Sequence, residues 1–305
     1  MEKIPVFYTS CMIADSEAFS PSAGKPEFVV KSWEKKFRIQ LLNVVPLTPK
    51  ELMIAHEYKM VRNILKCRTP NGFGNRSEDV ARTLPYTSGS MYQACLEALN
   101  NEEMACAPVS GFHHAGYSTP EGFCTFNGLM ICARLVRKSH KIRTGILDID
   151  AHYGNGTDDI IQHLKIDYVD HYTFGGDVRK NSAEGLNEIL RDIPKIIEGM
   201  HANGCKLLMY QAGADPHIND PLGGFYTSEQ LIERDRSVFE TCKRLKLPVV
   251  WNLAGGYQTV PGEKDFAKSI QPVIDIHDAT MAECCKVFLT SPKSALRNKR
   301  VKNSA

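Results

Sequence analysis

Short apolar runs alternate along the chain with longer segments in which apolar positions recur at helical spacing. The short runs, bounded by turn-forming residues, predict buried strands, and the longer segments predict amphipathic helices. No internal repeat or low-complexity linker interrupts this alternation, which favours a single α/β domain with a mainly parallel central sheet flanked by helices. The expected strands are 3–8, 104–109, 146–149, 167–172, 206–211 and 248–253.

The expected helices carry their apolar residues on one face and, in one place, a clear capping signal. Thr48 is the expected N-cap of one helix, with Pro49 at its first position, where a missing backbone N–H costs nothing. Turn formers in 20–25 and 69–78 predict surface loops, and a loop ahead of a helix often forms the rim of a pocket. The expected helices are 26–37, 49–67, 86–99, 126–136, 157–164, 188–202 and 228–245.

Polar residues concentrate where the strand 146–149 ends, in the sequence GILDIDAHYGNG. Asp148 precedes Asp150 and His152, and the last two can turn toward one point where the strand leaves its regular pleat. Carboxylate and imidazole ligands together suit a divalent metal of intermediate hardness such as zinc. For an isolated motif of this kind the structural interpretation, a capping aspartate beside a hydrogen-bonded histidine, is favoured.

Three other predicted strands are followed by side chains that can do chemistry. His113 and His114 follow one of these strands, Asp215 follows another, and Tyr257 follows the last in the sequence AGGY. Taken singly, each has a structural explanation as a turn carboxylate, a buried histidine or a loop tyrosine. The carboxyl ends of parallel strands meet at one edge of a sheet, where open α/β sheets bind their ligands, so we expect these groups to converge.

The composition limits the classes of partner. Of 305 residues, 43% are hydrophobic and 24% are charged, and 37 basic against 35 acidic residues leave a net charge of +2. This balance indicates neither nucleic-acid nor membrane binding, and no stretch approaches the roughly 18 apolar residues that span a bilayer. Basic residues concentrate at the end of the chain, so we expect a folded domain over 1–290 and a flexible tail over 291–305.

The cysteines indicate a reducing environment. All ten are scattered among other residues without a C-x-x-C pair, unlike a disulfide framework or a zinc finger. The chain begins without a charged and then apolar leader. We therefore expect a cytoplasmic protein, and leave open whether it forms a homo-oligomer.

The ordered set of motifs resembles the histone deacetylase family, part of the arginase–deacetylase group. GFHHA, GFCTFN, LDIDAHYGNGT, QAGADPHINDPLGG and LAGGY follow the family's order from about residue 104 to 260, roughly half of the chain. The first hundred or so residues match only loosely. The resemblance implies a single-domain, three-layer arginase/deacetylase-like fold, with the catalytic domain over 1–290.

The resemblance also implies a metal site. Asp150, His152 and Asp215 look like the three protein ligands of one zinc ion per chain, which leave positions open for water and the substrate carbonyl. Iron(II) can occupy such a site as well.

Five further residues resemble the family's catalytic groups. His114 is similar to the general base that then acts as an acid, and His113 to its electrostatic partner. Asp148 is expected to orient His113, and Asn155 stands where relatives place the Asp or Asn partner of His114. Tyr257 resembles the phenol that hydrogen-bonds the developing oxyanion.

The substrate channel is where this sequence departs from the family's pattern. The resemblance places Phe123, with Gly122 before it, along the acyl channel. Tyr153 follows His152 where relatives often have a second histidine. TFGGD replaces a longer aromatic and glycine-rich loop, which leaves Phe174 as the substitute for the second channel wall, and GFGNRSED offers no clear acidic rim residue.

The expected function is zinc-dependent removal of an acyl group, chiefly acetyl, from an amine such as a protein acetyl-lysine or an acetylpolyamine. One alternative is an arginase- or agmatinase-like ureohydrolase, because Asp150-Ala151-His152 is also similar to their metal motif. Gly154, however, lies where that motif supplies a further carboxylate for a second manganese ion. The other alternative is a non-catalytic module that binds acylated ligands.

Overall fold

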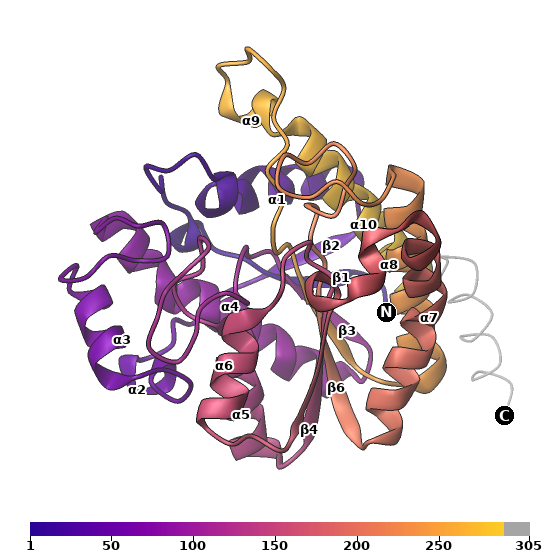
Figure 1. Cartoon of the computed structure of the whole chain (residues 1–305), viewed down its shortest axis with the longest axis horizontal. Coiled ribbons are helices and arrows are strands. Elements are labelled where there is room, and N and C mark those ends of the chain that lie inside the picture. Colours follow the sequence, from indigo (N-terminus) through magenta and orange to yellow (C-terminus); the bar gives the residue numbers. More distant parts are fainter. Residues whose placement is uncertain (290–305) are drawn as a thin grey trace, which may run out of the picture.

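A seven-stranded parallel sheet forms the centre of the computed structural model, which describes residues 1–289 (Figure 1). The strand order is β2-β1-β3-β7-β6-β4-β5, and neighbouring strands are parallel throughout. The predicted parallel α/β architecture is confirmed, whereas the predicted tail 291–305 lies outside the described residues. The strands are β1 (Ile4–Phe7), β2 (Ile39–Leu42), β3 (Met104–Ala107), β4 (Arg143–Asp148), β5 (Val169–Thr173), β6 (Cys205–Gln211) and β7 (Val249–Asn252).

Helices cover both faces of this sheet, which makes three layers (Figure 1). On one face α1, α7, α8 and α10 supply apolar side chains to one core, and on the other face α2 to α6 supply a second core. The helices are α1 (Lys25–Lys36), α2 (Pro49–Leu52), α3 (Tyr58–Leu65), α4 (Glu78–Asn101), α5 (Gly128–His140), α6 (Asn155–His163), α7 (Ala183–Ala202), α8 (Ser228–Leu245), α9 (Phe266–Ser269) and α10 (Gln271–Phe288).

The central strand β3 is apolar at every position because both of its faces are buried. In β3, Met104 and Cys106 join one core, while Ala105 and Ala107 join the other. Side chains of a strand alternate between the faces of a sheet, so burial on both sides requires a continuous apolar run. This is why the short apolar runs of the sequence are strands.

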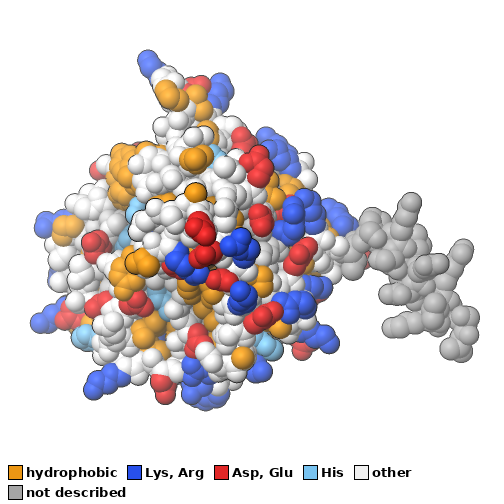
Figure 2. Space-filling view, turned by 45° about the vertical axis from the view of Figure 1, so that its right-hand side comes forward, with side chains coloured by type: hydrophobic (Ala, Val, Ile, Leu, Met, Phe, Trp, Pro, Cys, Tyr) orange, Lys and Arg blue, Asp and Glu red, His pale blue; other side chains and the backbone are white. Residues whose placement is uncertain are grey.

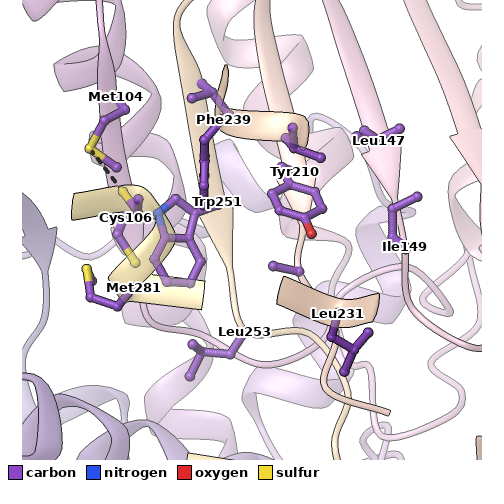
Figure 3. Close-up of a cluster of buried hydrophobic side chains, with 14 of the residues drawn as sticks. Met104, Cys106, Leu147, Ile149, Tyr210, Leu231, Phe239, Trp251, Leu253 and Met281 are labelled. Carbon is purple, nitrogen blue, oxygen red and sulfur yellow. Dashed lines mark hydrogen bonds between the residues drawn. The ribbon is translucent and has the colours of Figure 1, made fainter. Parts of the chain in front are cut away.

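Aromatic side chains from α8 and two strands pack together in the core on the α8 face of the sheet (Figure 3). Phe239 of α8 packs edge to face against Trp251 of β7 and Tyr210 of β6, with ring centroids 6.1 and 6.0 Å apart. Trp251 also contacts Trp33 of α1 at 5.4 Å. Each such ring buries a large apolar area, so these contacts join the sheet to helices from both ends of the chain.

The surface shows charges of both signs. On the face shown in Figure 2, acidic and basic side chains are interspersed, in keeping with the net charge of +2. Among the described residues, no helix combines the length and apolar character needed to cross a bilayer.

Three details of the predicted secondary structure were wrong, and one was confirmed. The edge strand β2 was missed, because its half-exposed residues lack a continuous apolar run. The segment 49–67 is two helices, α2 and α3, since Ala55 and His56 between them turn into the core. The helix predicted from residue 86 begins at Glu78, capped by Ser77, and continues through Pro85. The capping of α2 by Thr48 is confirmed, with Glu51 completing a capping box.

Candidate metal and catalytic centre

The carboxyl ends of four adjacent strands, β3, β7, β6 and β4, bring the predicted groups together. Asp150 and His152 follow β4, and Asp215 follows β6. Nδ1 of His152 lies 3.0 Å from Oδ1 of Asp150 and 3.0 Å from Oδ2 of Asp215. Asp150 and Asp215 are buried, whereas the His152 side chain remains 33% exposed, so the cluster is open to solvent only on the imidazole side.

Backbone hydrogen bonds fix these carboxylates. The backbone N–H of Ala151 donates to Oδ2 of Asp215 at 3.1 Å, and that of Gly255 donates to Oδ2 of Asp150 at 2.9 Å. A Cβ atom at Gly255 would lie 2.7 Å from Cγ of Asp215 and 2.8 Å from Oδ2 of Asp150. Only glycine therefore lets the loop after β7 approach both carboxylates, which explains the first glycine of the AGGY sequence.

The three side chains fit a divalent cation. They form a group of candidate ligands whose donor atoms all lie within 4.8 Å of one another. Their closest separations of 3.0 Å approach the roughly 3.3 Å between ligands in a tetrahedral zinc site. In addition, Oδ1 of Asp215 is buried and has no hydrogen-bond partner among residues 1–289. A buried carboxylate oxygen without a partner is costly, and a cation would relieve that cost.

The protonation equilibria reflect the same crowding of negative charge. Burial and the neighbouring Asp150 raise the pKa of Asp215 to about 8. Hydrogen bonds to Asp150 and Asp215 raise the pKa of His152 to about 10. Without a metal, the buried carboxylates thus hold a proton where a cation would otherwise balance their charge.

The two adjacent histidines lie beside the ligand cluster, each with its own partner. Nδ1 of His113 is 2.7 Å from Oδ2 of Asp148, and Nδ1 of His114 is 2.6 Å from Oδ1 of Asn155. The ring centroids of the two histidines are 4.1 Å apart. The structure therefore brings both histidines to the proposed partners, and Nε2 of each ring is left for other contacts.

The environments of the two histidines differ in charge. Burial alone would lower the pKa of His113, but the carboxylates of Asp148 and Asp150 outweigh it and raise the pKa to about 9. Burial and the adjacent His113 lower the pKa of His114. At neutral pH this arrangement favours a charged His113 beside a neutral His114, and such a divergence is typical of a pair with separate proton-transfer roles.

Tyr257 closes the site from the loop after β7. Its ring centroid lies 6.5 Å from that of His152 and 5.8 Å from that of Phe123, and only 8% of the residue is exposed. Its backbone N–H donates to Oδ2 of Asp220 at 2.7 Å. The sequence did not single out Asp220, because a carboxylate within a turn-rich segment looks like an ordinary turn residue.

A buried lysine behind the site was also missed. Lys25 is fully buried, and its Nζ donates to the carbonyl oxygens of Ala254 and Gly255 at 2.9 and 3.1 Å. Burial lowers its pKa to about 8, despite the nearby carboxylates of Asp215 and Asp150. Nothing in the sequence distinguishes this lysine from a surface residue at the start of an amphipathic helix.

Two further cationic side chains hold the loop that carries the candidate ligands Asp150 and His152. Nη1 of Arg234 donates to the carbonyl oxygens of Gly213 and Ile149, at 2.7 and 3.5 Å. From the opposite side, Nζ of Lys180 donates to the carbonyl oxygens of Ala151 and Gly175. Two backbone carbonyls of the loop that carries Asp150 and His152 thus receive charged donors, which rigidify it.

Of the three residues predicted to line the channel, two lie at the site and one does not. Gly122 has a positive φ of 55°, and a Cβ there would lie 2.4 Å from Cδ2 of His114, so it packs directly on the histidine. Phe123 contacts Tyr257 at the site. Phe174 does not line the site: it is fully buried, and its ring packs against Phe225 and Tyr226 in the core.

The short turn after β5 explains the position of Phe174. A Cβ on Gly175 would lie 1.9 Å from the carbonyl carbon of His152, so the backbone of this turn presses directly on the ligand loop. With its backbone in that place, the turn directs the phenylalanine ring away from the site and into the core. The expectation that Phe174 forms the second channel wall is therefore wrong.

The residues beside the ligand loop do not supply a second metal site. Tyr153 is 44% exposed, and its hydroxyl donates to Oδ2 of Asp158 at 2.5 Å. A Cβ at Gly154 would lie 2.7 Å from Oδ2 of Asp148, which leaves no room there for a carboxylate. Within residues 1–289, the Asp150, His152 and Asp215 cluster is the one candidate metal group.

Comparison with known proteins identifies a family model and several relatives. Residues 25–178 match the family model described as the histone deacetylase domain. An uncharacterized protein of Picosynechococcus sp. is 31% identical over 193 residues, which cover 58% of this chain and 63% of that protein. Histone deacetylase 2 of Arabidopsis thaliana is 30% identical over 164 residues, which cover 48% of this chain and 42% of the relative. The chain thus spans less than two thirds of these relatives.

A solved structure supports the fold over the whole chain. The crystal structure of an HDA15 HD domain matches with a TM-score of 0.68 at 17% identity, and the match covers 100% of this chain and 99% of that one. The family model spans half of the sequence and includes both histidines and the first two candidate ligands. The chain therefore belongs to the histone deacetylase family.

Proposed function

We propose that this protein is a zinc-dependent amidohydrolase that removes an acyl group, chiefly acetyl, from an amine such as acetyl-lysine or an acetylpolyamine. The observation that carries the proposal is the convergence at one sheet edge of Asp150, His152 and Asp215 with a histidine pair and Tyr257. The family of the chain and its named deacetylase relatives support it.

The protein groups account for the proton transfers that amide hydrolysis needs. Zinc, when bound by the two aspartates and His152, polarises the acyl carbonyl and lowers the pKa of water to about 7. Because Asn155 occupies Nδ1 of His114, Nε2 is the nitrogen free to accept a proton from water and deliver it to the leaving amine. A neutral His114 suits the first of these steps.

Two other groups stabilise the charge that develops during the reaction. His113, held by Asp148, places a cationic ring within 3.5 Å of Oδ1 of Asp150, where it offsets negative charge. The phenol of Tyr257 donates to the acyl oxygen as that oxygen becomes an anion. Loss of one such donor commonly costs roughly 10²- to 10³-fold in kcat.

The test is turnover by the zinc-loaded full chain on acetyl-lysine peptides, acetylpolyamines and longer acyl-lysines. We expect one zinc per chain and hydrolysis of at least one class. His114→Ala should lower kcat by roughly 10²- to 10⁴-fold, and Tyr257→Phe by about 10²-fold. Tyr153→Phe is the matched control, because this exposed phenol bonds to Asp158 rather than facing the cluster.

Two outcomes would contradict the proposal. Tight binding of acylated amines without turnover would instead support a non-catalytic binding module. A stoichiometry of two manganese ions together with release of urea would support a ureohydrolase. The structure argues against that function, because there is no room for a carboxylate at Gly154.

We also infer a reducing compartment, such as the cytoplasm. All ten cysteines are free, and seven of them are buried in apolar surroundings. Oxidising conditions select for paired cysteines in many secreted proteins, so this pattern supports an intracellular location.

A further inference from the structure

Three phenylalanines from separate loops gather around Tyr257 at the mouth of the site. Phe123 is in contact with all of the other rings, with centroids 5.6 Å from Phe19, 5.9 Å from Phe73 and 5.8 Å from Tyr257. Phe19 also stacks against Tyr257 at 6.2 Å, with an angle of 30° between the ring planes. We call these four residues the aromatic rim.

Phe19 is exposed although it belongs to this cluster. About two thirds of its surface, 67%, faces solvent, whereas Tyr257 beneath it is 8% exposed. Phe19 is therefore a large exposed apolar side chain that packs on two rings of the candidate site. A side chain in this position can contact a ligand that enters the site. Its ring must be passed by any group that reaches Tyr257 along the rim.

The loop that carries Phe19 is anchored to the loop that carries Phe73. Nδ2 of Asn75 donates to the carbonyl oxygen of Ser16 at 2.6 Å, and Oγ of Ser16 donates to the carbonyl oxygen of Ser20 at 3.2 Å. The backbone N–H of Phe73 donates to Oδ1 of Asn71 at 2.8 Å. These hydrogen bonds fix the two loops relative to each other and hold both rings against Phe123, so the aromatic rim has a defined structure.

The four side chains of the rim are aromatic, and three carboxylates near them in the sequence already have partners or belong to a helix. The segment 69–77 that carries Phe73 holds no Asp or Glu, and Glu78 after it is already the first residue of α4. The carboxylate of Glu121, next to Gly122, accepts a hydrogen bond from Nδ2 of Asn155 at 3.3 Å. On the other side, Oδ1 of Asp15 already accepts the backbone N–H of Glu17 at 2.9 Å. Flat aromatic faces contact methylene groups well but accept only weak N–H···π hydrogen bonds from a peptide.

We propose that Phe19 is a specificity-determining residue that supplies the channel wall which Phe174 does not. It selects an acylated amine on a slender, unbranched alkyl stem and disfavours acetyl-lysine flanked by other peptide residues. This inference rests on the proposed function, because it assigns a substrate class to the same site.

The test compares two substrates of the zinc-loaded full chain, mono-N-acetyl-1,4-diaminobutane and a pentapeptide with a central acetyl-lysine. We expect the small amine to be preferred, and Phe19→Ala to shift the ratio of their kcat/KM values toward the peptide by about 5- to 10-fold. Phe19→Trp keeps an aromatic wall and should retain the preference. Tyr58→Ala removes an aromatic residue of comparable exposure, 56%, from α3 and should leave the ratio unchanged.

Binding separates this inference from the proposed function. Calorimetry of both probes with zinc-loaded His114→Ala, with and without Phe19→Ala, measures the preference without turnover. One outcome is that the wild-type chain hydrolyses neither probe while Phe19→Ala still shifts the ratio of their affinities. That result would contradict the proposed activity but support the role of Phe19 in substrate selection. Equal losses for both probes, or an unchanged ratio in a variant with wild-type thermal stability, would overturn the role of Phe19.

Discussion

Lys25 and Asp150 are joined through a single residue, Gly255. The Gly255 carbonyl accepts a hydrogen bond from Nζ of Lys25 at 3.1 Å, and its N–H donates to Oδ2 of Asp150 at 2.9 Å. The same loop has left-handed backbone at Ala254, with φ of 50°, and ends at Tyr257. A buried cation from α1 therefore supports both a candidate ligand and the loop that presents the candidate oxyanion donor.

Replacing Lys25 by methionine is expected to loosen this loop. Lys25→Met leaves the buried carbonyl of Ala254 without its donor, at a cost of about 1–3 kcal/mol, whereas the Gly255 carbonyl keeps the backbone N–H of Ala214 as a donor. The free energy of unfolding should fall by a few kcal/mol, and kcat should fall more than KM changes, because Tyr257 is less well fixed. Urea unfolding and steady-state kinetics measure the two effects.

Lys31→Met is the matched control for this prediction. Lys31 lies on the same helix, but its ion pair with Glu27 at 2.6 Å is exposed. Surface pairs of this kind contribute about 1 kcal/mol or less. A Lys25 variant that behaved like the Lys31 variant would show that the buried ammonium does not support the loop.

Metal binding should reverse the effect of Asp215 on stability. Without metal, Asp215→Asn removes a carboxylate whose pKa is raised by burial and by Asp150, so the variant should be at least as stable as the wild type. Zinc at 100 times its Kd should stabilise the wild type by about 2.7 kcal/mol and the variant much less. Thermal unfolding with and without zinc measures this crossing.

An exposed carboxylate serves as the comparison. Asp167→Asn, just before β5, should leave both the metal-free stability and the zinc response unchanged. An Asp215→Asn chain that gained the full zinc stabilisation would remove Asp215 from the ligand set.

The sequence carried enough information to place the strands and the core of the site. Both faces of the sheet are buried, which produces continuous apolar runs in its central strands. Each of these runs ends a few residues before its functional residue, as in β4 before Asp150 and His152. Because neighbouring strands are parallel, their carboxyl ends then lie together at one edge of the sheet. The histidine partners Asp148 and Asn155 lie in the same short stretch, so the resemblance located them as well.

The supporting residues could not be located in this way. Lys25, Arg234 and Lys180 act by donating to backbone carbonyls, which leave no mark in a sequence, and the donors come from elements far away in the chain. Phe174 was misplaced because a sequence motif does not reveal on which side of a tight turn the ring lies. Phe19 was missed for the complementary reason, since an exposed phenylalanine in a loop predicts no particular contact.

Arg234 is expected to stabilise the core only as part of a pair. It is fully buried, and its Nε donates to Oδ1 of Asp235 at 2.9 Å, while the hydroxyls of Tyr210 and Thr280 also donate to that carboxylate. Arg234→Met should lower the free energy of unfolding by about 3–5 kcal/mol, because it leaves a buried charge unpaired. Urea denaturation measures the change.

A double-mutant cycle tests the pairing itself. The Arg234→Met and Asp235→Leu double variant should lose clearly less stability than the sum of the single variants. Arg244→Met, which removes from the same helix a guanidinium in an exposed ion pair with Glu198, should cost about 1 kcal/mol or less. Additive losses in the cycle would mean that the two buried charges do not stabilise each other.

His56 is expected to make folding sensitive to acid independently of the metal site. It is buried between α2 and α3, where Nδ1 lies 2.9 Å from the carbonyl oxygen of Gly116 and Nε2 accepts the backbone N–H of Asn127 at 2.8 Å. Burial lowers its pKa from 6.5 to about 4. The folded protein therefore holds this imidazole neutral, whereas the unfolded chain takes up a proton below pH 6.5.

The contribution of neutral His56 to the free energy of unfolding should therefore be fully present above pH 6.5. It should be lost as the pH falls from 6.5 toward 4, and the total loss should be about 3 kcal/mol. Urea unfolding of metal-free wild type and His56→Gln at pH 7.5, 6.0 and 4.5 isolates this contribution, because the other acidic groups are common to both chains. The stability advantage of the wild type should shrink over this range. An advantage that stayed constant would show that His56 titrates alike in the folded and unfolded states.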